Sequence, residues 1–128
     1  LLVSGSYIGS DNTHSESDRR FTEDVLKFRY DGSARRDTSE TASGLNLHFR
    51  LLRQPNADHY AVQAPDAILP ASCQAFPVFA FGGGQGAGVA YKGRSYRVVS
   101  MSFPFECIAE SKVRNLAMKA LLDFLTDK

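Results

Sequence analysis

The stretch over residues 76–103 constrains the fold of this chain more than any other feature. Three apolar, strand-like segments follow one another there, at 76–81, 88–92 and 96–103. The connections between them are short, and the first is rich in glycine. Strands joined in this way pair antiparallel, because parallel neighbours need a crossover of about a dozen residues or more. The sequence therefore predicts an antiparallel meander near the C-terminus.

A buried strand and a helix are predicted before the meander. The apolar run at 1–3 is broken by Gly5, which is typical of a short buried strand. The apolar face of a helix follows, with residues at helical spacing: Phe21, Val25 and Phe28. We expect Ser17 or Asp18 to cap this helix and Asp31-Gly32 to end it.

The middle of the chain carries weaker signals. Residues 31–44 are small, polar and charged, which indicates a loop with at most a short strand near Ala34. Residues 45–51 alternate between apolar and polar, the period of a half-buried strand. Residues 56–70 contain two prolines and predict an irregular connection with short extended pieces.

The clearest helix lies near the C-terminus. Its apolar residues recur at Val113, Leu116, Ala120 and Phe124, and Ser111 is the expected cap. A buried strand followed by a helix indicates an α/β fold, to which the meander adds antiparallel strands. We therefore expect one α/β domain over residues 1–128: a layered mixed sheet with a parallel part, an antiparallel C-terminal meander and packing helices.

Composition argues against several classes of function. The net charge of +1 gives no electrostatic reason for nucleic-acid binding, and no apolar run approaches the ~20 residues of a membrane span. Cys73 and Cys107 are compatible with a disulfide or with free thiols, but two cysteines make neither a disulfide scaffold nor a zinc pattern. His14, His48 and His59 lack metal-site spacing. We predict no metal, no cofactor, no nucleic-acid partner and no membrane span.

The glycine-rich run at 82–88 has two interpretations. A phosphate-binding loop needs a following Lys and Ser or Thr, and it opens a helix. Here Val89-Ala90-Tyr91 follows, which favours a strand. We therefore interpret the run as a hairpin connection whose glycines let the backbone approach a neighbour closely.

Several isolated residues are candidates with an ordinary structural alternative. Glu106 stands at the carboxyl end of a predicted strand, where α/β folds place their sites, or it complements a helix dipole. Cys107 is interpreted as a small buried residue, and Asp66 as a turn residue that bonds its own backbone. Arg35 and Arg36 are candidates for binding an anionic sugar or phosphate, or are simply solvated.

His48 and His59 lie in different predicted surroundings. His48 falls on the polar side of its predicted strand and is expected to face solvent. For His59-Tyr60, in the irregular connection, a binding role stays open.

The first nine residues raise the main functional question. The apolar run ends in Gly5-Ser6-Tyr7-Ile8-Gly9, just before the predicted helix. Many α/β enzymes mount a nucleophile on such a turn, with Ser or Cys at its centre, but here the centre is Tyr7. The pattern alone leaves open a working site, a disabled site and an ordinary turn.

Taken together, several stretches carry a resemblance over nearly the whole chain. The motifs are LVSGSYIGSD at 2–11, AGVAY at 87–91, VVSMSFPFE at 98–106 and LLDFL at 121–125, with residues 60–70 fitting as well. This set resembles the second half of a class I glutamine amidotransferase-like, flavodoxin-like domain. It is more closely similar to C-terminal regions of secreted Bacteroidetes proteins that carry the name xanthan lyase.

The resemblance implies a site whose usual groups are replaced. The family places a Cys at the centre of the turn and a His-x-Glu pair after a late strand, so that each group activates the next. In this sequence the nucleophile position is Tyr7, the histidine position is Phe103, and Glu106 lies near the carboxylate position. A phenol with an ordinary pKa near ~10 stays protonated at neutral pH without a base. We therefore expect the usual chemistry to be absent.

The resemblance also implies an organisation and a location. The family's turn follows several earlier βα units, so we expect this chain to come from a longer precursor that is secreted, periplasmic or on the cell surface. If the chain folds without those units, its first strand is an exposed edge, which favours a homodimer.

The first hypothesis for function is a non-catalytic α/β module of a secreted polysaccharide- or cell-wall-processing protein. It would act as a scaffold, contact other domains of the precursor or bind a glycan weakly. A separate hypothesis is an interaction domain for a partner protein, with Ala67-Ile68-Leu69-Pro70 or the exposed sheet edge as the contact. Ser6 and Asp11 join Arg35 and Arg36 as candidate ligand-binding residues.

The second hypothesis is an enzyme, either a polysaccharide lyase or an amidotransferase-like hydrolase with a non-standard site. A lyase would use Tyr7 or His14 as its base and Arg35 or Arg36 to neutralise a uronate.

Overall fold

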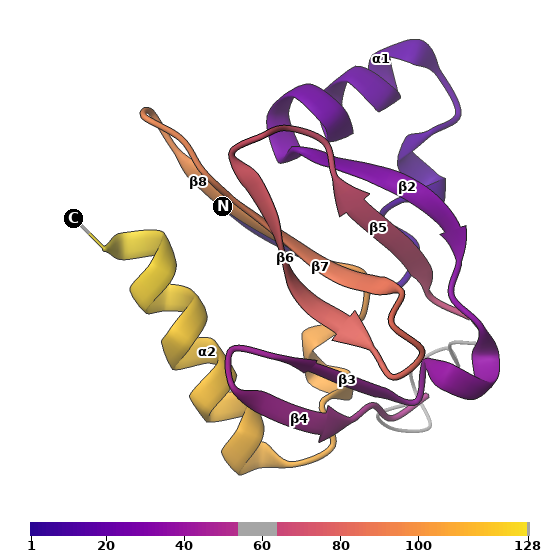
Figure 1. Ribbon diagram of the computed structural model, residues 1–128, viewed down its shortest axis with the longest axis vertical. Helices are drawn as coiled ribbons and strands as arrows, with labels where there is room; N and C mark the ends of the chain where they lie inside the picture. The colour runs from indigo at the N-terminus through magenta and orange to yellow at the C-terminus, as the bar shows by residue number, and fades with distance from the viewer. Residues whose placement is uncertain (54–63, 128) are drawn as a thin grey trace.

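The computed structural model describes residues 1–53 and 64–127, and these form a mixed α/β fold around a curled six-stranded sheet (Figure 1). The strands of this sheet are β1 (Leu2–Ser4), β3 (Thr41–Gly44), β4 (Leu47–Arg50), β6 (Ala75–Phe81), β7 (Gly86–Lys92) and β8 (Arg97–Met101). Their order is β1-β8-β7-β6-β3-β4. Only the β1–β8 pair is parallel among these neighbours, and the other pairs are antiparallel.

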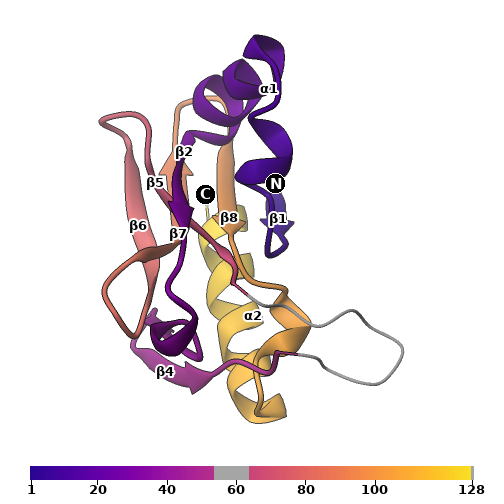
Figure 2. The ribbon, with the colours of Figure 1, turned by 90° about the vertical axis from the view of Figure 1, so that its right-hand side faces the viewer.

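The C-terminal meander and the parallel first strand are confirmed. Strands β6, β7 and β8 pair antiparallel in sequence order, as the short connections require. Strand β1 lies beside β8 at the edge of the sheet (Figure 2), with Leu2 opposite Val99. The other edge is β4.

A second, two-stranded sheet was not predicted. It consists of β2 (Phe28–Ser33) and β5 (Asp66–Pro70), which pair antiparallel. The predicted loop at 31–44 therefore contains the end of β2 and all of β3, and the predicted irregular connection ends in β5. These strands are short and their partners lie far away in sequence, so no local pattern marks them strongly.

The first helix differs from its prediction in its limits. Ser15, rather than Ser17 or Asp18, caps α1 (Glu16–Arg20): its Oγ accepts a hydrogen bond from the Asp18 amide at 3.1 Å. The helix continues as a π-helix over Phe21–Leu26 and stops at Lys27, which has a φ of 67°. After this residue the chain enters β2, where Phe28 is fully buried. The prediction that Phe28 lies on a helix face was therefore wrong.

Two further predictions needed correction at their ends. The predicted strand at 45–51 starts later, because Leu45 and Asn46 have φ values of 54° and 61° and form the turn between β3 and β4. Helix α2 (Ser111–Thr126) is confirmed, but its N-cap is Glu110 and not Ser111, and no side chain caps it.

Two apolar clusters hold these layers together. The larger cluster lies between the sheet and α2 and includes Phe49, Phe79, Phe103, Ile108, Ala117 and Leu121. The smaller lies between the sheet and the β2–β5 ribbon and includes Leu26, Phe28, Ile68, Val89, Tyr91 and Val98. Helix α2 and the β2–β5 ribbon accordingly lie on opposite sides of β7 and β8 (Figure 1). Among the described residues, no helix is long and apolar enough to cross a membrane.

Candidate functional site

The turn Gly5-Ser6-Tyr7-Ile8-Gly9, here called the elbow, leaves the sheet at the end of β1. The Gly5 amide still bonds the Met101 carbonyl of β8 at 3.1 Å, so the elbow begins where the parallel pairing ends. A 3-10 turn at Ser10–Asn12 follows. The Tyr7 carbonyl accepts a hydrogen bond from the Asp11 amide at 2.9 Å. The Tyr7 side chain is half-buried, and Asp11 is exposed.

Asp66, at the start of β5, forms hydrogen bonds with the elbow and with the residue that follows it. Its amide donates to the Ser6 carbonyl at 2.8 Å, and its carboxylate accepts from the Ser10 amide at 2.7 Å. The residue is only 1% exposed. Burial raises the pKa of this carboxyl group, while hydrogen bonds from the amides of Ser10 and Gly9 act in the opposite direction.

This role corrects the sequence interpretation of Asp66 as a residue that bonds its own turn. Its carboxylate instead bonds Ser10, far away along the chain. The available signal was an aspartate directly before the apolar segment Ala67-Ile68-Leu69, since an acidic residue at the start of a buried strand needs a partner. The sequence offered no means of naming that partner.

Gly9 ends the elbow because a side chain would not fit there. A Cβ at this position would lie 2.7 Å from Cδ1 of Tyr30 and 3.2 Å from Oδ2 of Asp66. The tight contact with the β2 ribbon explains the second glycine of the motif by packing.

Phe103, at the position that the resemblance assigns to the catalytic histidine, belongs to the core. It is 1% exposed. Its ring lies 5.5 Å from that of Phe79, 5.8 Å from that of Phe49 and 6.4 Å from that of Phe81, measured between ring centres. Such tilted and edge-to-face contacts stabilise an aromatic cluster. The cluster offers no proton acceptor to the elbow.

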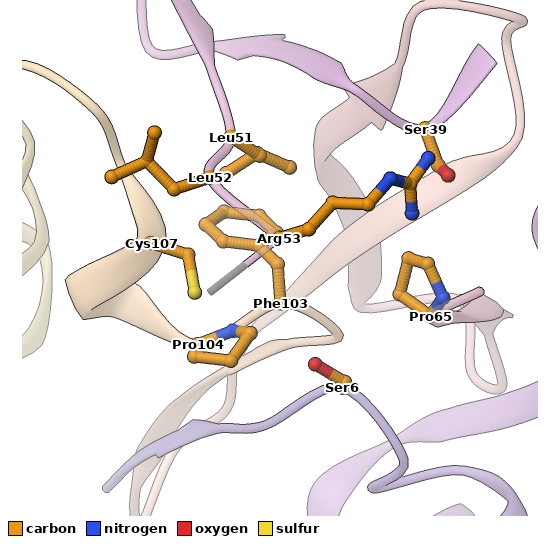
Figure 3. A pocket seen from close by; sticks show the side chains of 9 residues that line it. All are labelled: Ser6, Ser39, Leu51, Leu52, Arg53, Pro65, Phe103, Pro104 and Cys107. Atoms are coloured by element: carbon orange, nitrogen blue, oxygen red, sulfur yellow. The ribbon is translucent and has the colours of Figure 1, made fainter. Parts of the chain in front are cut away.

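A small cavity of about 20 Å³ separates the elbow from this aromatic cluster (Figure 3). We call it the closed cavity, and it is lined by Ser6, Ser39, Leu51, Leu52, Arg53, Pro65, Phe103, Pro104 and Cys107. It has room for about one water molecule, which needs roughly 10–15 Å³ by the same measure. Ser6 is fully buried, and its Oγ has no hydrogen-bond partner within the described part of the chain. In Figure 3 the Ser6 hydroxyl points toward Pro104 and Phe103, and Arg53 extends toward Ser39.

The thiol in this cavity is poorly suited to be a nucleophile. Cys107 is 2% exposed, as expected for a small buried residue. Its burial and, secondarily, the Glu106 carboxylate raise the pKa of the thiol, so the reactive thiolate is disfavoured. Cys107 and Cys73 are both free, and Cys73 is exposed. Glu106 itself is exposed on the 3-10 turn Phe105–Cys107.

The other predicted site residues lie on the surface. His14, His48, Arg35 and Arg36 are all exposed. The Arg35 amide donates to Oε1 of Gln85 at 2.8 Å, and the Arg36 carbonyl accepts from the Arg53 guanidinium at 2.5 Å.

Nothing in these contacts assembles the lyase site. Within the described part of the chain, no hydrogen bond or ion pair joins Tyr7, His14, Arg35 and Arg36 to one another. The lyase hypothesis therefore stays a prediction. His59 and Tyr60 lie outside the described residues.

The glycine-rich run is confirmed as a hairpin between β6 and β7. Gly84 has a φ of 91°, and a Cβ at Gly86 would lie 2.0 Å from the Ile68 carbonyl oxygen. Oε1 of Gln85, in this loop, accepts a hydrogen bond from the Arg35 amide just after β2. The loop is followed by β7 and not by a helix. Over residues 1–53 and 64–127, no group of three or more His, Cys, Asp or Glu side chains is arranged to hold a metal ion.

Comparison with known proteins adds no assignment to this geometry. No protein-family model matches the chain, and a search of curated proteins gives no match.

Proposed function

We propose that this chain is a non-catalytic α/β module of a secreted polysaccharide- or cell-wall-processing protein, and that its elbow serves as a structural support. The observation that carries the proposal is the buried aromatic cluster around Phe103. A proton acceptor is required at that position if a group on the elbow is to act as a nucleophile.

The neighbouring groups support the same conclusion. A tyrosine phenol without a base is a poor nucleophile at neutral pH. The Ser6 hydroxyl is buried against Phe103 and Pro104 rather than against an imidazole. The Cys107 thiol has a raised pKa. Loss of the nucleophile or base of such a relay removes several orders of magnitude of rate.

The test is turnover and covalent labelling. The protein should not hydrolyse glutamine, simple esters or amides, and mass spectrometry should find no adduct after incubation with electrophilic analogues of these substrates. Because Cys73 is a free, exposed thiol, the labelling should use the Cys73→Ser variant. Turnover, or an adduct on Tyr7, Ser6 or Cys107, would contradict the proposal.

The open edge of β1 supports a role in contacts between domains or copies. Within residues 1–53 and 64–127, β1 pairs with β8 and is the edge strand of the sheet. An apolar edge strand is a template for pairing with another strand. We therefore propose a homodimer through this edge. Light scattering at high concentration should give the mass of a dimer, and Leu1→Lys should lower it to that of a monomer; a wild-type protein that is monomeric throughout would contradict this part.

A further inference from the structure

A second hollow lies near the C-terminal end of the elbow, where Tyr30 packs against Gly9, and neither the sequence motifs nor the proposed function uses it. We call it the open hollow; its volume is about 380 Å³, and it is lined by Thr13, Arg19, Thr22, Glu23, Arg29 and Tyr30. Its walls are α1, the π-helix and β2. Binding sites for small molecules typically measure about 300–1,000 Å³, so its size suits a ligand as large as a monosaccharide.

The elbow supports this hollow directly. The ring of Tyr30 packs against Gly9, so closely that a Cβ on Gly9 would collide with it. Oγ1 of Thr13 donates a hydrogen bond to the Ser10 carbonyl at 3.1 Å, directly after the elbow. Two lining residues are therefore positioned by the turn that Asp66 fastens.

The π-helix forms another wall. π-helices are rare, and they occur often at functional sites. Here the wider turn carries Thr22 and Glu23. Thr22 is 2% exposed, and its Oγ1 donates to the Arg19 carbonyl at 3.0 Å. That bond fixes the junction at which α1 becomes the π-helix.

The charged groups of the open hollow leave positive charge available. Arg19 forms no side-chain hydrogen bond or ion pair with any residue that the structure describes, whereas its neighbour Arg20 pairs with Glu16 at 2.8 Å. Nε of Arg29 lies 3.9 Å from the Glu23 carboxylate. Both groups of that pair face solvent and are far apart for an ion pair, so the pair is weak. Two guanidinium groups and one carboxylate make the lining net positive.

The remaining polar atoms of the lining are acceptors. Thr13 donates its hydroxyl hydrogen to the Ser10 carbonyl, so its oxygen can only accept a hydrogen bond from a ligand. The Glu23 carboxylate is also an acceptor. A ligand that satisfies this lining has an anionic group for the arginines and hydroxyl donors for the oxygens. Arginine binds a planar carboxylate with two parallel hydrogen bonds.

We propose that the open hollow binds a hydroxylated carboxylate of the size of a hexuronic acid. Arg19 and Arg29 would bind its carboxylate, and the oxygens of Thr13 and Glu23 would accept hydrogen bonds from its hydroxyl groups. This inference rests on the proposed function, since it names the ligand class of a module that binds without transforming. In this proposal the elbow has a structural role in binding, because it positions Tyr30 and Thr13 in the wall of the hollow.

The experiment is a titration of the isotope-labelled chain followed by amide NMR shifts. Glucuronate should bind with a dissociation constant on the order of 1 mM, as expected for a few charge-assisted hydrogen bonds in an open site. Glucose, which lacks the carboxylate, and acetate, which lacks the hydroxyl groups, should each bind about tenfold more weakly or worse. The shifted amides should lie in α1, the π-helix and β2.

Matched arginine variants test the residues. Arg19→Gln and Arg29→Gln should each weaken glucuronate binding about tenfold, the loss expected for one charge-assisted contact. Arg20→Gln should leave it unchanged, because Arg20 is paired with Glu16 and does not line the hollow. These side chains are exposed, so the variants should fold, and their melting curves check this.

The outcomes separate this inference from the proposed function. Absence of saturable glucuronate binding, equal binding of glucose, tighter binding of inorganic phosphate, or an equal loss in Arg20→Gln would overturn the ligand assignment and leave the non-catalytic proposal standing. Chemical conversion of glucuronate in the same NMR samples would overturn the non-catalytic proposal instead.

Discussion

The two hollows beside the elbow differ in size, polarity and exposure. The closed cavity holds about 20 Å³ between Ser6, Phe103 and Cys107, all of which are buried. The open hollow holds about 380 Å³ and is lined by arginine, threonine, glutamate and tyrosine side chains. The closed cavity is bounded mainly by apolar side chains, with Ser6, Ser39 and Arg53 as its polar lining, and the open hollow carries more charged and hydroxyl groups.

One residue connects the two sides. The amide of Asp66 holds the carbonyl of Ser6, which lines the closed cavity. Its carboxylate holds the amide of Ser10, whose own carbonyl accepts from Thr13 in the open hollow. Packing and the hydrogen bonds of Asp66 therefore account for the position of this turn between the two hollows.

The largest change in stability is expected from a substitution in the apolar core beside the closed cavity. Phe103→Ala removes a fully buried ring from the aromatic cluster and should lower the free energy of unfolding by about 3–5 kcal/mol. Urea denaturation measures this loss. Phe21→Ala is the matched control: Phe21 is 47% exposed and outside the core, so its truncation should cost only about 1–2 kcal/mol. Equal losses in the two variants would mean that the histidine position is not part of the core.

The contrast between predicted and unpredicted regions has a physical reason. The meander and α2 were predictable because their signals are local: apolar runs joined by short connections, and apolar residues at helical spacing. The second sheet was missed because β2 and β5 pair across a long stretch of sequence. Phe28 fits a helix face equally well until the positive φ of Lys27 turns the chain.

From the sequence, only the replacement of the expected nucleophile and base at the candidate site was predictable. The sequence places Tyr7 and Phe103 at the two positions in question, and a phenylalanine side chain has no group that can accept a proton. The hydrogen bonds of Asp66, and the presence of Arg19 and Arg29 in the lining of one hollow, depend on where the second sheet and the π-helix lie. Spacing along the chain carries no information about such contacts.

The second prediction concerns the residue that joins the two sides. Asp66→Ala leaves the amide of Ser10 without its carboxylate acceptor and should cost about 1–3 kcal/mol, the penalty for one unpaired buried group. It should also weaken glucuronate binding, because Thr13 and Tyr30 lose their support. The exposed Asp37 provides the control, and Asp37→Ala should change stability by no more than about 0.5 kcal/mol. Unchanged melting of Asp66→Ala would contradict the fastening role.

The third prediction uses pH. Burial raises the pKa of Asp66 in the folded protein, so the folded state holds this proton more tightly than the unfolded chain. Its contribution to stability is therefore most favourable below the ordinary aspartate pKa, and it declines as pH rises through the raised pKa of the folded state.

The Asp66→Asn variant does not titrate at this position and isolates the effect. Wild-type unfolding free energy minus that of the variant should decrease between mildly acidic and neutral pH, because the other carboxyl groups contribute equally to both proteins. A difference that increases with pH would mean that the amide hydrogen bonds outweigh burial and that the carboxyl pKa is lowered.

The smallest effect compares two serines that lie two residues apart. Oγ of Ser4 donates to the Phe103 carbonyl at 3.0 Å and accepts from the Phe105 amide at 2.8 Å, whereas Oγ of Ser6 has no partner among the residues described. Ser4→Ala should therefore cost about 1 kcal/mol, the net value of a hydrogen bond of this kind. Ser6→Ala should cost nothing or stabilise the fold by up to about 1 kcal/mol, because an unpaired buried hydroxyl is unfavourable. An equal loss in both variants would show that the Ser6 hydroxyl is bonded inside the closed cavity, and that the apolar side of the elbow still holds a polar partner.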